Sequence, residues 1–484
     1  MSQVLFLMGL YGFGVYFSLL FTRQLAVLLI GISGFLWGAL FWVLGGMTLL
    51  MLQLPYTSTS MAILFIILVI GISLLHFKNK TWQISRREMI YLITMALVFL
   101  VVLILASQYN LSIASTDSII YIVTGRRIPY EGFSQSVMVE LADRGGFLPL
   151  LQSASVFLGD DYIFAAQPAF GLSLAGIYFY LTQRILGHLL NDKRLALSLS
   201  ILSGLVLFST YFVVFQTFYI HTNIICAVYL FLSVCGFWLA SVEEKDSWVI
   251  VGMISLLGFS LARLESPVFA LPFLVLLISW GKIPYRILLV SILPYLTYLI
   301  IWYLYLSRGV GDVDLTLDQP RTLAVIGVLA ACIILVLFSK VNWIKRWVLP
   351  HLPMIMLGVL VLVVAIMFIQ KPEHMYTSMK VILKNVLESG RWGITWVVFS
   401  FLVFISLFWP GSLREAYFFY GISSFLLLLL AISYFRVPYR VGWGDSANRM
   451  LTHILPILIL YGLINLPQGI SGWGIHEKSM TTKV

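Results

Sequence analysis

Charged side chains are scarce in this chain. They make up 10% of its 484 residues, whereas apolar residues make up 61%, and the mean hydropathy is +0.99. A soluble protein of this length needs many more polar residues to cover its surface. The composition therefore excludes an ordinary soluble enzyme and predicts a chain whose solvent is largely lipid.

Cysteine is rare too, and the common nucleotide and nucleophile motifs are missing. Cys226, Cys235 and Cys332 each lie within an apolar run, where a small buried side chain is expected rather than a disulfide or a metal ligand. His221 and His453 form no metal-ligand spacing, and we interpret them as packing residues. No P-loop, dinucleotide fingerprint or serine or cysteine nucleophile motif occurs. We therefore expect no metal site from these residues and disfavour a nucleotide-sugar donor bound on the inner side.

The sequence consists largely of long apolar runs. Each is near the length that a helix needs to cross a bilayer, and hydrocarbon favours helices because it offers backbone amides no other partner. The predicted fold class is all-α: a polytopic transmembrane helix bundle of about 13–15 membrane helices with short extracytoplasmic interfacial helices. The first run lacks a basic leader, so we expect a retained span and not a signal peptide. The expected spans are roughly 4–21, 25–53, 60–76, 89–107, 162–183, 195–214, 218–240, 248–262, 266–280, 287–306, 322–339, 347–369, 392–409, 416–435 and 450–466.

Basic residues set the expected orientation of these spans. Lys78, Lys80, Arg86 and Arg87 crowd the link before the fourth span, which the positive-inside rule places in the cytoplasm. Alternation then assigns the other basic clusters between spans to the inside, and with them the whole formal net charge of +10. Because this charge is a sorting signal and no nucleic-acid motif accompanies it, no nucleic-acid partner is expected.

The stretch after the fourth span is predicted to be outside and structured. Ser118 to Val123 is expected to form a short helix that Gly125 and Pro129 end, and Ser134 to Asp143 a second, amphipathic helix. Phe147 to Leu158 is apolar but too short to span comfortably, so we expect it to lie in the interface or to re-enter it.

Four other outward segments are rich in polar groups and are expected to converge above the bundle. In the third, apolar and charged positions alternate at helical spacing, which predicts a helix on the outer leaflet. In the first, Arg263 and Glu265 lie between two apolar runs, where charges need a partner or a wet cavity. The four segments are Ala262–Pro267, Arg308–Arg321, Gln370–Arg391 and Arg436–Arg449.

Several motifs together resemble the GT-C superfamily of polytopic glycosyltransferases, which use polyprenyl-phosphate sugars. The resemblance covers roughly residues 89–466, with an outer loop at 108–161. The three spans in 1–88 depart from the family pattern and are interpreted as an N-terminal addition, and 467–484 as a cytoplasmic tail. The motifs are Asp117-Ser-Ile-Ile-Tyr121, Ser134–Asp143, Phe147-Leu-Pro-Leu-Leu151, Leu158-Gly-Asp-Asp161 and Asn448-Arg-Met-Leu-Thr-His-Ile-Leu-Pro456.

The resemblance implies an inverting sugar transfer from a polyprenyl-phosphate donor to an acceptor hydroxyl of a glycan, lipid or protein. It implies an extracytoplasmic active face, and we expect the plasma membrane of a bacterium. Asp117 matches the family's base, which removes the acceptor proton. The leaving phosphate needs cations, and the remaining polar candidates are assigned to the acceptor or the sugar. The phosphate candidates are Arg449, Arg440, Arg436 and Arg263, and the acceptor or sugar candidates are Tyr121, Glu265, Asp160 and Asp161.

Each of these residues also has a purely structural interpretation. Asp117 fits the start of a helix, where a carboxylate complements the helix dipole. Asp160 and Asp161 fit solvated boundary residues or weak metal ligands, so a divalent cation stays open as a cofactor. The arginines of 436–449 fit interfacial anchors among membrane lipids, and Arg263 and Glu265 fit a pair that stabilises a tight hairpin.

Two other functions also fit the sequence. A transporter or flippase of a lipid-linked saccharide or other amphiphile places charges at mid-membrane and often has two related halves. We find no internal repeat, and the polar residues gather at one surface, which favours chemistry on the outer face. An oligosaccharide polymerase or ligase is the third function, and it is expected to depend on arginines more than on a loop aspartate.

Overall fold

The computed structural model describes residues 1–21, 25–79, 84–279, 283–310, 319–407, 413–435 and 438–469. All regular structure in these ranges is helical, apart from one isolated β-bridge between Ile113 and Tyr219. The predicted all-α fold class is confirmed.

Nine helical segments in the described ranges are long and apolar enough to cross a membrane. The chain is therefore a multi-pass membrane protein, as predicted. These segments are Ser2–Phe21, Val27–Met51, Ser58–Lys78, Arg86–Gln108, Asn223–Glu243, Tyr285–Arg308, Ile344–Gln370, Ala416–Tyr434 and Ser446–Asn465.

Several other predicted spans correspond to shorter or broken helices. α13 (Asp246–Ala262) and α14 (Ser266–Ser279) are apolar but short, because the link that holds Arg263 separates them, and the apolar part of α16 (Gln319–Phe338) is short as well. α10 (Lys193–Ser209) and α11 (Tyr211–Phe218) are long and apolar enough to cross a membrane only if they form one span. The two helices are bent by 72° relative to one another. In the part of the chain that the structure describes, fewer helices than the roughly fifteen expected are thus full-length spans by themselves.

The helices fall into two compact units. Unit 1 comprises Met1–Ile177 and Phe215–Pro353, and unit 2 comprises Tyr178–Val214 and Met354–Val484. The first helices are packed inside unit 1, so the division does not follow the boundary expected after residue 88. The boundary after residue 88 was inferred from the resemblance to a family, and the packing of the helices does not test it, so it stays a prediction.

Unit 1 holds most of the helices, and three further helices run from one unit into the other. Those three are α9 (Ala166–Leu189), α11 (Tyr211–Phe218) and α17 (Leu352–Gln370). The helices wholly in unit 1 are α1 (Ser2–Ser18), η1 (Leu19–Phe21), α2 (Val27–Met51), α3 (Ser58–Asn79), α4 (Arg86–Gln108), α5 (Thr116–Glu131), α6 (Gln135–Arg144), α7 (Phe147–Gln152), α8 (Ala154–Leu158), α12 (Asn223–Glu243), α13, α14, α15 (Tyr285–Val310), α16, η2 (Ile344–Val348) and η3 (Leu349–His351).

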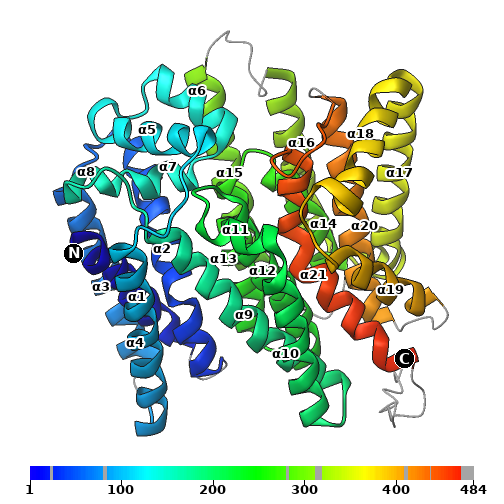
Figure 1. Ribbon diagram of the computed structural model, residues 1–484, viewed down its shortest axis with the longest axis horizontal. Helices are drawn as coiled ribbons and strands as arrows, with labels where there is room; N and C mark the ends of the chain where they lie inside the picture. The colour runs from blue at the N-terminus through cyan, green and yellow to red at the C-terminus, as the bar shows by residue number, and fades with distance from the viewer. Residues whose placement is uncertain are drawn as a thin grey trace. The chain divides into compact units, whose positions relative to one another are not determined.

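The short helices α5 to α8 gather at one end of unit 1, the end at which α4 finishes (Figure 1). α12 is buried along nearly its whole length and forms the centre of the core. Trp42 of α2 donates its indole N–H to the Leu150 carbonyl of α7 at 3.0 Å, and the Tyr229 hydroxyl of α12 donates to the Leu36 carbonyl. These bonds attach the N-terminal helices to both the core and the short-helix end.

α5 is longer than predicted. It continues through Gly125 and Pro129 and ends at Gly132, which has φ +60°. A Cβ at position 125 would lie 2.5 Å from the Pro149 carbonyl oxygen of α7. Gly125 therefore permits a close helix contact and does not end the helix, so the prediction that Gly125 and Pro129 terminate it is wrong.

The helix α6 and the segment Phe147–Leu158, at the same end of unit 1, can also be compared with the sequence prediction. α6 forms where the second outer helix was expected, with Ser134 as the N-cap that accepts the Val137 N–H. Phe147 to Leu158 forms α7 and α8, and α7 is fully buried against α2, α5 and α13. α7 is thus a packing element of unit 1, whereas the end of α8 is half-buried, and the expected position of this segment in the interface or as a re-entrant segment stays a prediction.

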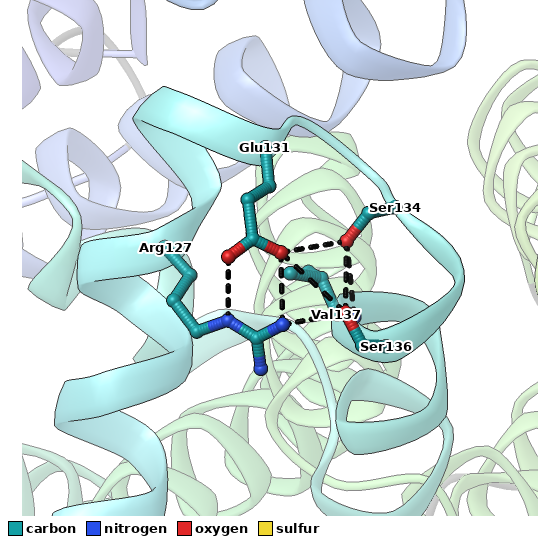
Figure 2. Close-up of polar contacts among 5 residues, drawn as sticks. All are labelled: Arg127, Glu131, Ser134, Ser136 and Val137. Atoms are coloured by element: carbon teal, nitrogen blue, oxygen red, sulfur yellow. Dashed lines mark hydrogen bonds and ion pairs between the residues drawn. The ribbon is translucent and has the colours of Figure 1, made fainter.

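An ion pair within α5 is hydrogen-bonded to the start of α6 at a corner exposed to solvent. The Arg127 guanidinium donates to both oxygens of Glu131 at 2.8 Å, and the Ser134 hydroxyl also donates to Glu131, at 2.9 Å (Figure 2). Ser136 completes the group through bonds to Arg127 and Ser134. These bonds lower the pKa of Glu131 to about 2, chiefly through the bond from Arg127.

Unit 2 contains the predicted surface helix. α18 is amphipathic: Met375, Ser378 and Val381 are buried, whereas Lys380 and Lys384 are exposed. The helices wholly in unit 2 are α10, α18 (Pro372–Lys384), η4 (Asn385–Ser389), α19 (Thr395–Leu407), α20 (Leu413–Tyr434) and α21 (Ser446–Gly469).

Candidate functional site

Asp117 lies in the first turn of α5, half-buried at the short-helix end of unit 1. The chain before it is fixed to the link between α11 and α12. Ile113 exchanges backbone hydrogen bonds with Phe218 and Ile220 at 2.7 and 3.0 Å, and the Ser115 and Tyr219 hydroxyls are 2.7 Å apart. Asp117 is thus the first-turn acid of a helix whose start is fixed at a distant part of the chain, and Ser115, not Asp117, is the N-cap residue.

One helical turn further on, Tyr121 is buried beside His221. Their rings meet edge to face at 5.3 Å, and the His221 ring also stacks on Tyr219 at 5.4 Å. Gln167 donates its amide N–H to the His221 carbonyl. His221 is therefore a packed ring, as predicted, and it fixes Tyr121 on the same side of α5 as Asp117, because positions i and i+4 share a helix face.

Arg263 and Glu265 form a buried ion pair next to Tyr121. The Arg263 Nη2 to Glu265 Oε1 distance is 2.6 Å, and each side chain is only 10% exposed. Arg263 Nη1 donates to the Asn223 side-chain oxygen at 3.3 Å, and the Asn223 amide donates to Gln216 Oε1 at 2.9 Å. We refer to Tyr121, Gln216, Asn223, Arg263 and Glu265 as the Arg263 cluster.

The charge of Arg263 is stable in this site. Burial acts to lower its pKa, but the Glu265 carboxylate and, to a smaller extent, the Tyr121 hydroxyl raise it, and the pKa stays above its ordinary value. Arg263 is therefore a permanent buried cation. The interpretation of Arg263 and Glu265 as partners of one another is what the structure shows, and Asn223 adds a third member.

The link that carries the ion pair is held tightly in place. The Tyr303 hydroxyl donates to the Leu264 carbonyl at 2.5 Å. Gly145, with φ +86°, lies so close that a Cβ there would be 2.8 Å from the Arg263 Cα. The end of α6 and the helix α15 thus fix the position of Arg263.

Asp160 and Asp161 do not form a paired acidic site. Asp160 Oδ2 accepts hydrogen bonds from Ser2 and Gln3 of α1, at 3.0 and 3.5 Å. Asp161 pairs with Arg126 of α5 at 3.0 Å and is exposed. The two carboxylates therefore fix different elements, which favours the structural interpretation for both.

The predicted arginines of the last outward segment belong to unit 2. The exposed Arg440 donates its backbone N–H to Asp445 Oδ1 at 2.8 Å, and its carbonyl accepts a bond from Asn385. Arg449 is half-buried in the first turn of α21, and its backbone N–H donates to the Asp445 carbonyl. Arg436 lies outside the described residues.

Within unit 2, two of the outward segments converge as expected. The Asn385 side chain accepts the Gly442 N–H at 2.8 Å in addition to its bond to Arg440. The buried Asn448 amide donates to the carbonyls of Gly390 and Trp443, at 3.2 and 3.1 Å, and its oxygen accepts the Trp392 indole N–H. The segment Arg308–Arg321 falls largely outside the described residues.

Sequence reasoning missed Asn223 and Gln216. Both are polar residues at or within an apolar run. A polar side chain in such a run needs a partner, and this requirement could have identified both residues as candidates. In the described ranges no group of three or more His, Cys, Asp or Glu side chains could hold a metal ion, so the structure indicates no position for a divalent cation.

Comparison of the chain with protein-family models, with curated proteins and with solved structures found no match.

Proposed function

We propose that this chain is an integral membrane glycosyltransferase that moves a sugar from a polyprenyl-phosphate donor to an acceptor hydroxyl on the extracytoplasmic face. One observation carries the proposal. α5 presents the Asp117 carboxylate and, one turn later, Tyr121, which neighbours the buried cation of Arg263. A carboxylate that can accept a proton and a fixed, buried ion pair thus belong to one end of unit 1, and deprotonation of an acceptor hydroxyl requires such a carboxylate.

In this proposal Asp117 acts as the general base. Its carboxylate accepts the proton of the acceptor hydroxyl while the acceptor oxygen forms a bond to the anomeric carbon. The bond between that carbon and the phosphate oxygen breaks on the opposite side, so the configuration inverts and polyprenyl phosphate leaves. The half-buried position of Asp117 leaves it accessible to an acceptor.

Arg263 is best assigned a positioning role. Its Nη1 and Nη2 atoms are engaged by Asn223 and Glu265, which neutralises much of its charge before any phosphate arrives. The pair orients the link and the neighbouring Tyr121, which we assign to the acceptor or the sugar. Arg440 and Arg449 belong to unit 2, so their assignment to the donor phosphate stays a prediction from the sequence alone, and Glu265 becomes a support for Arg263.

Asp117→Asn tests the proposal. Full-length protein in proteoliposomes is incubated with polyprenyl-phosphate-linked hexoses and pentoses and an envelope glycan and lipid extract as acceptor. Release of polyprenyl phosphate is measured by mass spectrometry. We expect Asp117→Asn to lower the rate roughly 10²- to 10⁴-fold, the range of general-base catalysis. Glu373→Gln, an exposed first-turn acid of α18 in unit 2, is the matched control and should keep the rate.

Two results contradict the proposal. Full activity of Asp117→Asn would remove the base assignment, and failure of the wild-type protein to consume any donor would remove the transfer. A parallel assay of fluorescent polyprenyl-phosphate translocation separates the transporter alternative. Translocation that is the same in wild type and Asp117→Asn, without donor cleavage, favours a flippase.

A further inference from the structure

Arg391 in unit 2 has a backbone conformation that its side chain does not favour. It follows η4 with φ +58°, in the left-handed region where glycine is the ordinary choice. The neighbours on both sides are fixed: the Gly390 N–H donates to the Asn385 carbonyl at 2.8 Å, and the buried Trp392 is bonded to Asn448. Such an outlier, held by its surroundings, is characteristic of functional positions.

The guanidinium of Arg391 contacts two aromatic rings. It lies 5.3 Å from the centre of the Tyr211 ring and 5.4 Å from that of Trp443, and its Nη1 donates to the Tyr211 hydroxyl at 3.4 Å. The bond to Tyr211 engages one N–H group of the exposed side chain, and the remaining N–H groups of a guanidinium can still form the fork that fits two phosphate oxygens. These partners are uncharged, so they orient the cation without neutralising it.

An apolar stripe follows Arg391 along the chain. Ile394, Val397 and Phe401, at the start of α19 and along it, are 66%, 64% and 62% exposed. Their spacing of three and four residues places Val397 and Phe401 on one helix face, with Ile394 at its start. An exposed cation at the head of an exposed apolar stripe matches a molecule that has a phosphate at one end and an alkyl chain at the other.

We propose that Arg391 binds the phosphate of a membrane amphiphile, whose alkyl chain lies along Ile394, Val397 and Phe401. Tyr211 and Trp443 orient the guanidinium and do not contact the phosphate. The site is complete within unit 2 and does not depend on the proposed sugar transfer, so either proposal can fail without the other.

Binding of dodecyl phosphate to the full-length protein in a neutral detergent tests this site. Arg391→Gly is the decisive variant, because glycine favours φ +58° and the backbone should be at least as stable as in the wild type. We expect at least about tenfold weaker binding in Arg391→Gly with an unchanged or raised unfolding temperature. Arg391→Lys, which keeps the charge and loses the fork, should bind with intermediate affinity. Lys380→Gln, at an exposed lysine of α18, should bind as the wild type does.

Two further probes show which kind of phosphate compound occupies the site. Inorganic phosphate should bind much more weakly than dodecyl phosphate, since the stripe contributes only when a chain is present. Competition by phosphatidylglycerol identifies a bilayer headgroup as the occupant, and its failure to compete identifies a phosphate monoester. Binding by Arg391→Gly within twofold of wild type overturns the proposal, and equal affinity for inorganic and dodecyl phosphate overturns the role of the stripe.

Discussion

At the scale of single residues, the Arg263–Glu265 pair is the clearest case of charge placed where it is costly. Both side chains are nearly buried, so each has lost most of its hydration, and the bond between them offsets that loss only while both are present. Removal of one partner should therefore cost the protein far more stability than removal of both. That asymmetry distinguishes its structural from its functional contribution.

Glu265→Ala is expected to lower the free energy of unfolding by about 3–5 kcal/mol, because it leaves the Arg263 cation buried without its carboxylate. The double variant Arg263→Met with Glu265→Leu should recover most of this stability. Denaturant unfolding of both variants in detergent measures the difference. Sugar transfer should stay low in the stable double variant if the pair positions the site, and wild-type transfer there would show that the pair serves the fold alone.

Gly145 is a residue at the short-helix end whose replacement should be poorly tolerated. Its φ of +86° disfavours any side chain, and a Cβ would lie 2.7 Å from the Ala262 carbonyl oxygen. Gly145→Ala should therefore destabilise the protein by about 1–3 kcal/mol and displace the link that carries Arg263. Thermal unfolding measures the effect. Gly159→Ala is the control: its φ of +70° is also unfavourable, but no neighbour lies within 4 Å, so a loss as large as that of Gly145→Ala would refute the steric argument.

At the scale of elements, the corner between α5 and α6 depends on one ionised carboxylate. The pKa of Glu131 is lowered from 4.5 to about 2, so the folded corner favours the charged form. Its contribution to stability is fully present above pH 4.5 and is lost as the pH falls towards 2. The start of α6 should consequently open more easily in acid.

Hydrogen–deuterium exchange of the segment around Ser134 to Val137 checks this. After correction for the intrinsic exchange rate, protection should fall between pH 5 and pH 3 in the wild type, the range in which an unfolded glutamate titrates. Glu131→Gln should show low protection that does not change with pH. A wild-type profile that is flat over this range, or a Glu131→Gln profile that follows the wild type, would contradict the assigned role of the pair.

The helices with local signals were the ones that the sequence predicted well. α6 has its N-cap at Ser134, and the spacing in α18 predicted the amphipathic helix, although Ser378 and Val381 are buried where Met379 was expected to be. The length of α5 was not predictable from its own sequence. Gly125 is needed because α7 packs against it at Pro149, and not because the helix ends there. The burial of α7 likewise depends on contacts with distant helices, which local hydropathy does not reveal.

The candidate site shows the same limit. Arg263 and Glu265 are two positions apart, so their need for partners could be seen in the sequence, whereas Asn223 is 40 positions from Arg263 and was not identified. The strained backbone of Arg391 leaves no mark in composition or periodicity. The roles of Asp117, Arg440 and Arg449 in catalysis stay predictions.

At the scale of the whole molecule, the distribution of charge implies which side of the membrane the short-helix end of unit 1 faces. The expected topology places the formal net charge of +10 in the cytoplasmic links, among them the link between α3 and α4. α4 leads from this link to α5, so the corner at Ser136 should face the extracytoplasmic side. The proposed donor reaches Asp117 only if this orientation is correct.

Cysteine labelling in intact cells tests the orientation. The native Cys226, Cys235 and Cys332 are buried, so a membrane-impermeant maleimide should give little background. Ser136→Cys, in the exposed corner, should be labelled in intact cells, and Thr81→Cys, in the link between α3 and α4, only after permeabilisation. The reverse pattern would place Asp117 in the cytoplasm and remove the extracytoplasmic reaction. It would leave the phosphate site at Arg391 untouched, because that site rests on contacts within unit 2.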